Sequence, residues 1–246
     1  MTKKIALVTG GMGGIGTAIC KTLAETGHTV VTTYSKSGRE QAWLADMNGL
    51  GFTDIHCYQC DVADFAACQS MVARIVKDLG PVSILVNNAG ITRDASFKKQ
   101  TKDDWDAVIR TNLDSVFNMT KPVLDGMLEA GFGRIINISS INGQKGQFGQ
   151  TNYSAAKAGM HGFTMALAQE VAKKGVTVNT ISPGYIATEM VMAVPEDVRN
   201  KIIAQIPVGR LGKPEEIAAL VGFLSSEHAG FITGSNIAMN GGQHMM

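Results

Sequence analysis

Short runs of β-branched and other apolar residues alternate along the chain with longer segments of helical character. The runs that predict strands are KIALVT, TVVTTY, IHCYQC, SILVNN, GRIINIS, VTVNTIS and SNIAMN. The segments between them that predict helices are residues 15–27, 39–48, 64–79, 103–129 with an interruption, 153–173 and 214–226. Strand, helix and strand at this rhythm are typical of parallel βαβ units with helices on both faces of the sheet. The pattern therefore predicts an α/β fold with one doubly wound, mostly parallel sheet of seven strands.

The length and composition are those of one packed globular domain. The chain has 246 residues, 45% of them hydrophobic, and a mean hydropathy of +0.07, which is enough apolar material to bury a large core. No repeat, low-complexity tract or Pro/Ser-rich linker divides it. We therefore expect residues 1–246 to form a single domain.

The charge is nearly balanced, because 22 Lys and Arg stand against 21 Asp and Glu, for a net charge of +1 at pH 7. The longest basic run is a lysine pair, so the basic patch typical of nucleic-acid-binding proteins is missing. The N-terminal stretch MTKKIALVTGG has four consecutive apolar residues, too few for a signal-peptide core or a membrane span. We expect a cytoplasmic protein with no nucleic-acid partner and no membrane insertion.

Cysteines occur at positions 20, 57, 60 and 68, and CYQC forms a C-x-x-C pair. Such a pair can be half of a zinc or redox site, but a zinc site needs a second ligand pair at matching spacing, and the sequence offers none. The histidines, His161 among them, also lack ligand partners at such spacing. We interpret them as packing or surface residues and expect no metal.

The first predicted strand ends in TGGMGGIG, residues 9–16, directly before a predicted helix. Its glycines fit both G-x-G-x-x-G and T-G-x-x-x-G-x-G. In either frame glycine permits a tight turn and a close approach of the backbone to a pyrophosphate, which the free N–H groups of the following helix would bind. The loop therefore predicts a dinucleotide site.

The second predicted strand indicates which dinucleotide is bound. NAD sites usually carry a carboxylate there that binds the ribose 2′-hydroxyl, yet no carboxylate occurs between Glu25 and Glu40. Lys36 and Arg39 follow the strand instead, and arginine can bind a 2′-phosphate with two parallel donors. This pattern favours NADPH, unless both cations are ordinary surface residues.

Polar and small residues follow the next two predicted strands. Asp61 comes after the third strand, either as a partner for the adenine amino group or as a helix N-cap. Asn88, Ala89 and Gly90 follow the fourth strand. The small side chains leave room for a flat ring or a sugar, and the Asn amides can tie neighbouring strand ends together.

Tyr153 and Lys157 are four residues apart in a predicted helix, so their side chains share a face. Reduction of a ketone by hydride requires an acid near the oxygen, and free tyrosine, with a pKa near 10, is a poor acid at neutral pH. A neighbouring ammonium stabilises the phenolate. We therefore expect Lys157 to lower the pKa of Tyr153 and make it a usable proton donor.

Six features occur in one order: TGGMGGIG, NNAG, Asn112 in RTNL, Ser140 in NISS, Tyr153-x-x-x-Lys157 and SPG at 182–184. Together they resemble the short-chain dehydrogenase/reductase family along essentially the whole chain. The resemblance implies a single NADP-binding Rossmann domain and a homotetrameric assembly.

The resemblance also implies roles for individual residues. The implied catalytic residues are Asn112, Ser140, Tyr153 and Lys157. The implied cofactor contacts are Gly10, Gly13, Gly14, Ile15, Gly16, Arg39, Asp61, Val62, Asn88, Ala89, Gly90, Tyr153, Lys157, Pro183, Gly184, Ile186 and Thr188. Ser140 would bind the substrate carbonyl, Lys157 the nicotinamide ribose, and Asn112, interrupting a long helix, would support a water-linked proton path. Ser139 is the weaker candidate, because adjacent strand residues point to opposite faces.

The stretch INGQKGQFGQTNYSAAKAG, with ISPGYIATEMV after it, is similar to the family of acetoacetyl-CoA reductases. This similarity implies NADPH-dependent reduction of acetoacetyl-CoA to (R)-3-hydroxybutyryl-CoA for polyhydroxybutyrate synthesis. It implies that Asp94, Ser140, Gln147, Phe148, Gln150 and Tyr185 contact the acyl-CoA substrate. It also implies a mobile lid at about residues 184–210, whose closure would exclude water.

Two alternative functions stay open. Reductases of 3-oxoacyl groups on acyl carrier protein, from fatty acid synthesis, are close relatives of this family. A non-catalytic dinucleotide-sensing protein is the other possibility, although such proteins usually lack the Tyr or the Lys that this chain keeps. The Gln and Phe side chains near residue 148 could equally be subunit contacts.

Overall fold

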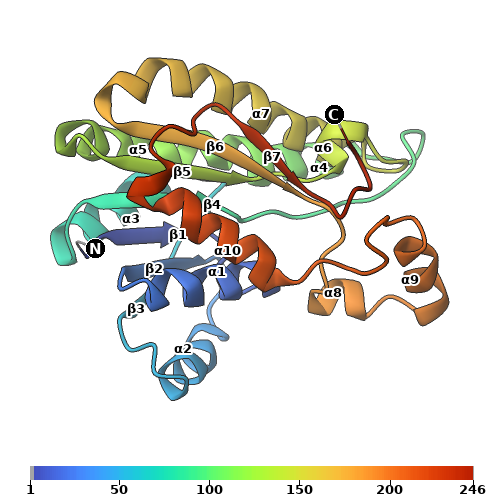
Figure 1. Ribbon diagram of the computed structural model, residues 1–246, viewed down its shortest axis with the longest axis horizontal. Coiled ribbons are helices and arrows are strands. Elements are labelled where there is room, and N and C mark those ends of the chain that lie inside the picture. The colour runs from blue at the N-terminus through green and yellow to red at the C-terminus, as the bar shows by residue number, and fades with distance from the viewer. Residues whose placement is uncertain (1–2, 246) are drawn as a thin grey trace.

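Seven strands form one sheet in the computed structural model, which describes residues 3–245 (Figure 1). They are β1 (Ile5–Val8), β2 (Thr29–Tyr34), β3 (Ile55–Gln59), β4 (Val82–Asn87), β5 (Gly133–Ile138), β6 (Val176–Pro183) and β7 (Asn236–Met239). The strand order is β3-β2-β1-β4-β5-β6-β7, and every neighbouring pair is parallel. Each predicted strand is confirmed, and the sheet is parallel throughout rather than mostly parallel.

The helices follow the predicted segments, with a few additions. They are α1 (Gly14–Glu25), α2 (Glu40–Gly49), α3 (Phe65–Asp78), α4 (Lys102–Ile109), α5 (Ser115–Ala130), α6 (Asn142–Lys145), α7 (Thr151–Val171), α8 (Glu189–Met192), α9 (Glu196–Ile203) and α10 (Pro214–Ser225). The expected interruption of the long helix is a π-helical turn, Arg110–Asp114, between α4 and α5. The short helices α6, α8 and α9 were not predicted from the sequence.

Both faces of the sheet are covered, so most residues of its central strands are buried. Ile5 and Leu7 pack into a core with α3, α5 and α7, whereas Ala6 and Val8 pack into a second core with α1, α2 and α10. In Figure 1 α7 lies at the top of the molecule, α10 passes in front of the sheet and α2 lies at the bottom. Each fully buried aliphatic side chain contributes about 1.5–3 kcal/mol to this packing.

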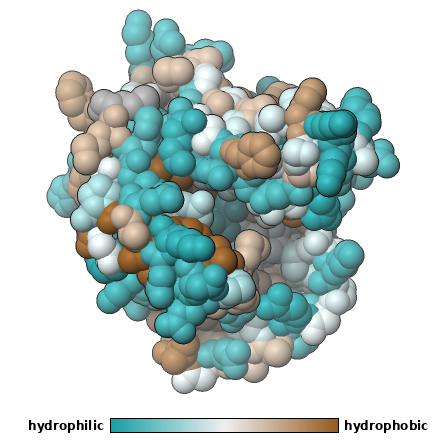
Figure 2. Space-filling model, turned by 90° about the vertical axis from the view of Figure 1, so that its right-hand side faces the viewer, coloured by the Kyte–Doolittle hydropathy of each residue, from teal (hydrophilic) through white to brown (hydrophobic). Residues whose placement is uncertain are grey.

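The strand order reverses between β1 and β4, which makes their carboxyl ends the place where a doubly wound sheet binds ligands. These ends point to the right in Figure 1, where α8 and α9 lie beyond them. Figure 2 views the molecule from that side and shows a surface that is hollowed near its centre and largely hydrophilic around the hollow. The fold therefore presents the loops that follow β1 to β6 at one open edge.

Within residues 3–245, no helix has the length and apolar character needed to cross a membrane. In the same part of the chain, no group of three or more His, Cys, Asp or Glu side chains is arranged to hold a metal ion. The thiol of Cys60 lies 3.7 Å from that of Cys68 in α3, both in the buried core. Cys60 of the C-x-x-C pair therefore takes part in the packing between β3 and α3.

Candidate active site

The glycine loop after β1 is folded so tightly that side chains are excluded at particular positions. Gly10 has a φ of +64°, which favours glycine. A Cβ on Gly16 would lie 2.3 Å from the Gly10 carbonyl oxygen, and one on Gly11 would lie 2.1 Å from Thr32 Oγ1. In the described chain no side chain caps α1, whose N-cap is Gly13, and no acidic residue occupies its first turn. The free N–H groups there fit the pyrophosphate of a dinucleotide.

Amide side chains tie the neighbouring strand ends together, as the sequence predicts. Asn88 Nδ2 donates to the carbonyl oxygens of Thr9 (3.0 Å) and Gly10 (3.1 Å). Thr9 Oγ1 in turn accepts hydrogen bonds from the backbone N–H groups of Asn88 and Ala89, both at 3.0 Å. These bonds join the end of β1 to the end of β4 at the point where the strand order reverses.

Asn112 lies in the π-helical turn with its side chain completely buried. Its Oδ1 accepts from Ile91 N at 2.8 Å, and its Nδ2 donates to Ile91 O at 2.9 Å. A Cβ placed on Gly90 would lie 3.4 Å from Asn112 Oδ1 and 3.5 Å from Lys157 Nζ. The missing side chain of Gly90 therefore leaves a space that two of the predicted catalytic residues border.

Lys157 is only 3% exposed, and its Nζ donates to the Ile138 carbonyl oxygen at 2.8 Å. The same Nζ lies 5.6 Å from the ring centroid of Tyr153, one helical turn earlier on α7. Burial penalises the ammonium and lowers the pKa of Lys157 to about 8. The ammonium therefore still predominates at pH 7, although burial makes it easier to deprotonate.

Tyr153 does not have the lowered pKa that its neighbour Lys157 led us to expect. Burial raises the pKa of the phenol, a hydrogen bond with Ser140 lowers it, and the charge of Asp94 raises it further, with a net upward shift. The expectation was wrong for the chain by itself, because removing the phenolate from water raises the pKa by more than the hydrogen bond with Ser140 lowers it. A usable acid at this position requires a further positive charge or a change in solvation.

Ser139 and Ser140, which follow β5, point in different directions. Ser140 Oγ accepts from Asn142 N at 3.1 Å and interacts with Tyr153, whereas Ser139 Oγ donates to the Lys157 carbonyl oxygen at 2.8 Å. The preference for Ser140 as the residue facing the phenol agrees with this geometry. Asn112, Ser140 and the Tyr153–Lys157 pair, from three separate segments of the chain, thus come together at one edge of the sheet.

Comparison with known proteins places this constellation in a family. The family described as short chain dehydrogenase matches residues 4–199. The chain belongs to the short-chain dehydrogenase family.

Three relatives illustrate the similarity along the full length. The chain is 60% identical over 246 residues to "Acetoacetyl-CoA reductase" of Cupriavidus necator, covering 100% of both chains. It is 58% identical to "Nodulation protein G" of Azospirillum brasilense, covering 98% of each. It is 45% identical to "3-oxoacyl-[acyl-carrier-protein] reductase FabG" of Vibrio harveyi, covering 99% of this chain and 98% of that one.

In this short-chain dehydrogenase, the residues expected near the adenosine half of a dinucleotide lie after β2 and β3. Lys36 and Arg39 are both exposed, directly before α2. Asp61 borders a cavity of about 210 Å³ together with Arg110. The alternative reading of Asp61 as a helix N-cap is wrong, because Asp64 caps α3 by accepting from Ala67 N at 3.0 Å.

The remaining predicted cofactor residues of this short-chain dehydrogenase follow the same edge. Ile15 lies in the first turn of α1, Val62 after β3, Pro183 at the end of β6, and Gly184, Ile186 and Thr188 in the segment that follows. A Cβ on Gly14 would lie 3.0 Å from Thr188 Cγ2. Thr188, near the start of the predicted lid, therefore lies against the glycine loop.

The predicted substrate residues lie in two places. Gln150 Nε2 donates to Asp94 Oδ2 at 2.8 Å, and Gln150 Oε1 accepts from Asn142 Nδ2 at 2.9 Å. Gln147 and Phe148 precede this network, and the Phe148 side chain is 89% exposed. Tyr185 instead borders a cavity of about 330 Å³ between the segment after β6, α10 and β7. None of the four predicted catalytic residues lines this cavity. The described structure thus does not bring Tyr185 into one pocket with the other substrate residues.

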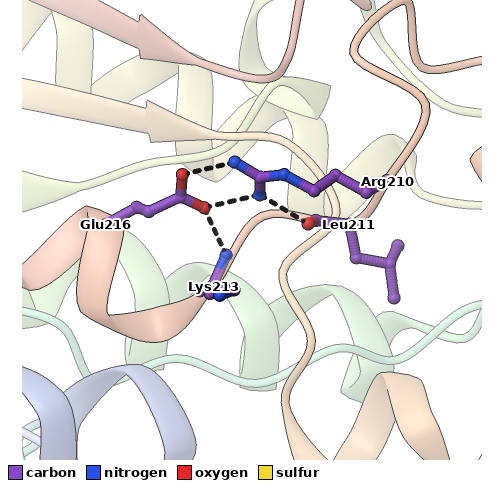
Figure 3. Close-up of polar contacts among 4 residues, drawn as sticks. All are labelled: Arg210, Leu211, Lys213 and Glu216. Carbon is purple, nitrogen blue, oxygen red and sulfur yellow. Dashed lines mark hydrogen bonds and ion pairs between the residues drawn. The ribbon is translucent and has the colours of Figure 1, made fainter.

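Arg210, at the carboxyl-terminal end of the predicted lid, is clamped to α10 (Figure 3). Arg210 binds Glu216 through two bonds, Nη2 to Oε1 at 2.7 Å and Nη1 to Oε2 at 2.8 Å. Glu216 Oε2 also accepts from Lys213 N at 2.7 Å. Hydrogen bonding to Arg210 is the main reason why the pKa of Glu216 is lowered to about 2.

The segment after β6 also binds the residues just before α10. Gly212 N donates to Tyr185 O at 2.9 Å, and Ala187 N donates to Gly212 O at 2.8 Å. Arg210 and Glu216 lie on one side of this contact and Thr188, next to the glycine loop, on the other, so both ends of the predicted lid segment are held to the rest of the fold. The clamp was missed from sequence, although the spacing of Arg210 and Glu216 around Pro214 was its signal.

His161, expected to be a packing or surface residue, is half-buried one helical turn beyond Lys157. Its Nε2 atom lies 3.0 Å from Ser139 Oγ.

Proposed function

We propose that this chain catalyses the NADPH-dependent reduction of acetoacetyl-CoA to (R)-3-hydroxybutyryl-CoA, a precursor of polyhydroxybutyrate. The observation that carries the proposal is the convergence of Ser140, Tyr153, Lys157 and Asn112 beside the glycine loop in a chain that matches an acetoacetyl-CoA reductase over its whole length. The 60% identity to that relative, against 45% to the acyl-carrier-protein reductase, favours the CoA substrate over the alternative.

Two hydroxyl groups at this edge suit the binding of a ketone oxygen. Ser140, held through Asn142 N, would donate a hydrogen bond to the oxygen, and Tyr153 would donate a proton to it as negative charge develops. When bound, the reduced nicotinamide supplies the hydride. Ser140 also interacts with the Tyr153 phenol, so the substrate oxygen would complete a set of groups that already lie together.

The positive charge of Lys157 would help Tyr153 to donate its proton. Its ammonium, 5.6 Å from the Tyr153 ring centroid, stabilises the phenolate that proton donation leaves behind. One of its three N–H groups is bonded to Ile138 O, which leaves donors for ribose hydroxyls. Asn112 lies close to the same ammonium across Gly90 and would hold the Ile91 backbone in place for the return of a proton through water.

The preference for NADPH rests on the end of β2. Arg39 and Lys36 are exposed there. The segment between Glu25 and Glu40, which contains β2, carries no carboxylate to bind a 2′-hydroxyl. A planar guanidinium matches phosphate oxygens through two donors. The two cations would therefore favour the 2′-phosphate.

The substrate chain would lie between the Gln150 network and the lid. Gln150 is held by Asp94 and Asn142, so its amide is pre-oriented toward polar groups of a thioester substrate. Phe148, largely exposed, would cover the acyl group, and Tyr185 would join it only when the lid residues 184–210 close. Closure excludes water from the reacting atoms.

The proposal includes a cytoplasmic homotetramer. Exposed aromatic side chains support subunit contacts: Phe65 on α3 and Phe117 on α5 are 36% and 52% exposed, and their ring centroids lie 5.7 Å apart. Exposed apolar groups gathered on helices favour burial against another subunit. Light scattering of the purified chain measures the assembly directly.

The decisive experiment follows NADPH oxidation with acetoacetyl-CoA and with the acetoacetyl group on acyl carrier protein. We expect a higher kcat/KM on the CoA thioester. A higher value on the carrier protein would favour the alternative reductase. Binding of NADPH without turnover of either substrate would instead indicate a sensing protein.

A further inference from the structure

His161 lies directly behind the predicted catalytic residues. It follows Lys157 by one turn of α7, and the ring is half-buried. Its Nε2 atom is 3.0 Å from Ser139 Oγ, after β5, and 3.3 Å from Ser182 Oγ, in β6. Nε2 of His161, on α7, thus contacts residues at the carboxyl ends of the adjacent strands β5 and β6.

The hydrogen-bond partners of Ser139 determine where the ring carries its proton. The hydroxyl of Ser139 has one hydrogen, and it donates it to the Lys157 carbonyl oxygen at 2.8 Å, because a carbonyl can only accept. Towards His161, Ser139 must therefore accept, and Nε2 must carry a hydrogen. Ser182 leads to the same conclusion, because its hydroxyl donates to Asn236 Oδ1 at 2.7 Å.

The ring is neutral under ordinary conditions. Burial lowers the pKa of His161 below its usual value, so at pH 7 the imidazole holds one proton. The two serine contacts place that proton on Nε2 and leave the lone pair on Nδ1. The required tautomer is therefore Nε2–H.

We propose that His161 is a positioning residue of the active site, whose single Nε2–H group bridges Ser139 and Ser182 and so holds the ends of β5 and β6 against α7. Ser139 is covalently next to Ser140, and Ser182 precedes Pro183, which is expected at the cofactor. Ser139 also binds the backbone of Lys157. The bridge thereby sets the position of Ser140 relative to Tyr153 and Lys157, and its kinetic consequence rests on the proposed reductase function.

Two amide variants separate positioning from space filling. His161→Gln places an amide N–H close to the position of Nε2, whereas His161→Asn places it near Nδ1, short of the serines. Small displacements of reacting groups cost up to about 100-fold in rate, so we expect His161→Asn to lower kcat by about tenfold or more, with the KM for NADPH changed by less than about twofold. We expect His161→Gln to stay within about threefold of the wild-type kcat.

Equal kcat values for the Gln and Asn variants, or a loss confined to KM, would overturn the proposal. A second measurement uses the cofactor-free chain with ¹⁵N-labelled histidine, in which the His161 signals are assigned by their absence from the His161→Gln spectrum. We expect a protonated Nε2 and an unprotonated Nδ1, and the opposite tautomer would also refute the bridge. If the wild-type chain fails to reduce acetoacetyl-CoA, only the proposed function falls, because the tautomer is measured without substrate or cofactor.

Discussion

Replacing Lys157 by methionine tests how much the burial of its ammonium group lowers the stability of the folded chain. Burial lowers the pKa of Lys157 from its usual 10.5 to about 8, which corresponds to about 3 kcal/mol against the charged form. Methionine has a similar length and no charge, so Lys157→Met removes this cost from the folded chain. It also leaves the Ile138 carbonyl oxygen without its donor, which costs about 1–3 kcal/mol at every pH.

The pH dependence isolates the charge from the lost hydrogen bond. Because folding lowers the pKa of Lys157, the unfolded chain binds more protons than the folded chain between about pH 8 and 10.5, and stability rises with pH in that window. With these pKa values the free energy of unfolding of the wild-type chain should rise by about 1 kcal/mol relative to that of Lys157→Met between pH 7 and pH 9. The hydrogen-bond loss is the same at both values and cancels.

The assay is urea unfolding of the cofactor-free chain at pH 7 and pH 9, for the wild type, Lys157→Met and the matched variant Lys173→Met. Lys173 is exposed after α7, so its variant should follow the wild type at both values. Turnover of the Lys157 variant should be lost. A free-energy difference between wild type and Lys157→Met that does not change with pH would refute the assignment of Lys157 as a buried cation held at a cost.

Further predictions test other parts of the site. Tyr153→Phe should fold and bind NADPH but lose turnover by several orders of magnitude in the NADPH-oxidation assay, and near-normal activity would exclude Tyr153 as the acid. Arg39→Ala should raise the KM for NADPH by about tenfold and that for NADH by much less, and equal effects would contradict 2′-phosphate recognition. Gly16→Ala should abolish NADPH binding in titration calorimetry, because its Cβ would meet the Gly10 carbonyl oxygen at 2.3 Å. The control Gly49→Ala, at the end of α2 with no atom within 4 Å of its Cβ, should keep it. Arg210→Lys keeps the positive charge but loses the two parallel hydrogen bonds to Glu216, so the KM for acetoacetyl-CoA should rise about two- to fivefold because the lid is held less tightly. An unchanged KM would show that this ion pair does not affect substrate binding.

Much of this protein can be predicted from its residue pattern. The alternation of β-branched, largely apolar runs with helical segments predicted all seven strands, because a sheet covered on both faces buries most of its strand residues. The glycine loop was equally predictable, since the contacts at Gly11 and Gly16 exclude any larger residue. The spacing of Tyr153 and Lys157 determines by helix geometry alone that they share a face.

Contacts between distant segments were decided only by the tertiary structure. Strand pairing of β4 with β5 places Gly90, which follows β4, at the same edge as Ile138, whose carbonyl oxygen binds Lys157. No local pattern states which strands are neighbours. The capping role of Asp64 rather than Asp61 depends on where α3 begins.

The protonation of individual side chains likewise could not be predicted from the sequence. Spacing predicted a lowered pKa for Tyr153, but burial raises it, because desolvation depends on everything packed around the phenol and not on its neighbour in the helix. The hydrogen on His161 is similarly assigned by serines 22 and 21 positions away. The sequence by itself thus determined the elements and the types of chemical group, whereas tertiary packing decided their partners and charges, since solvation and hydrogen bonding depend on all atoms nearby in space.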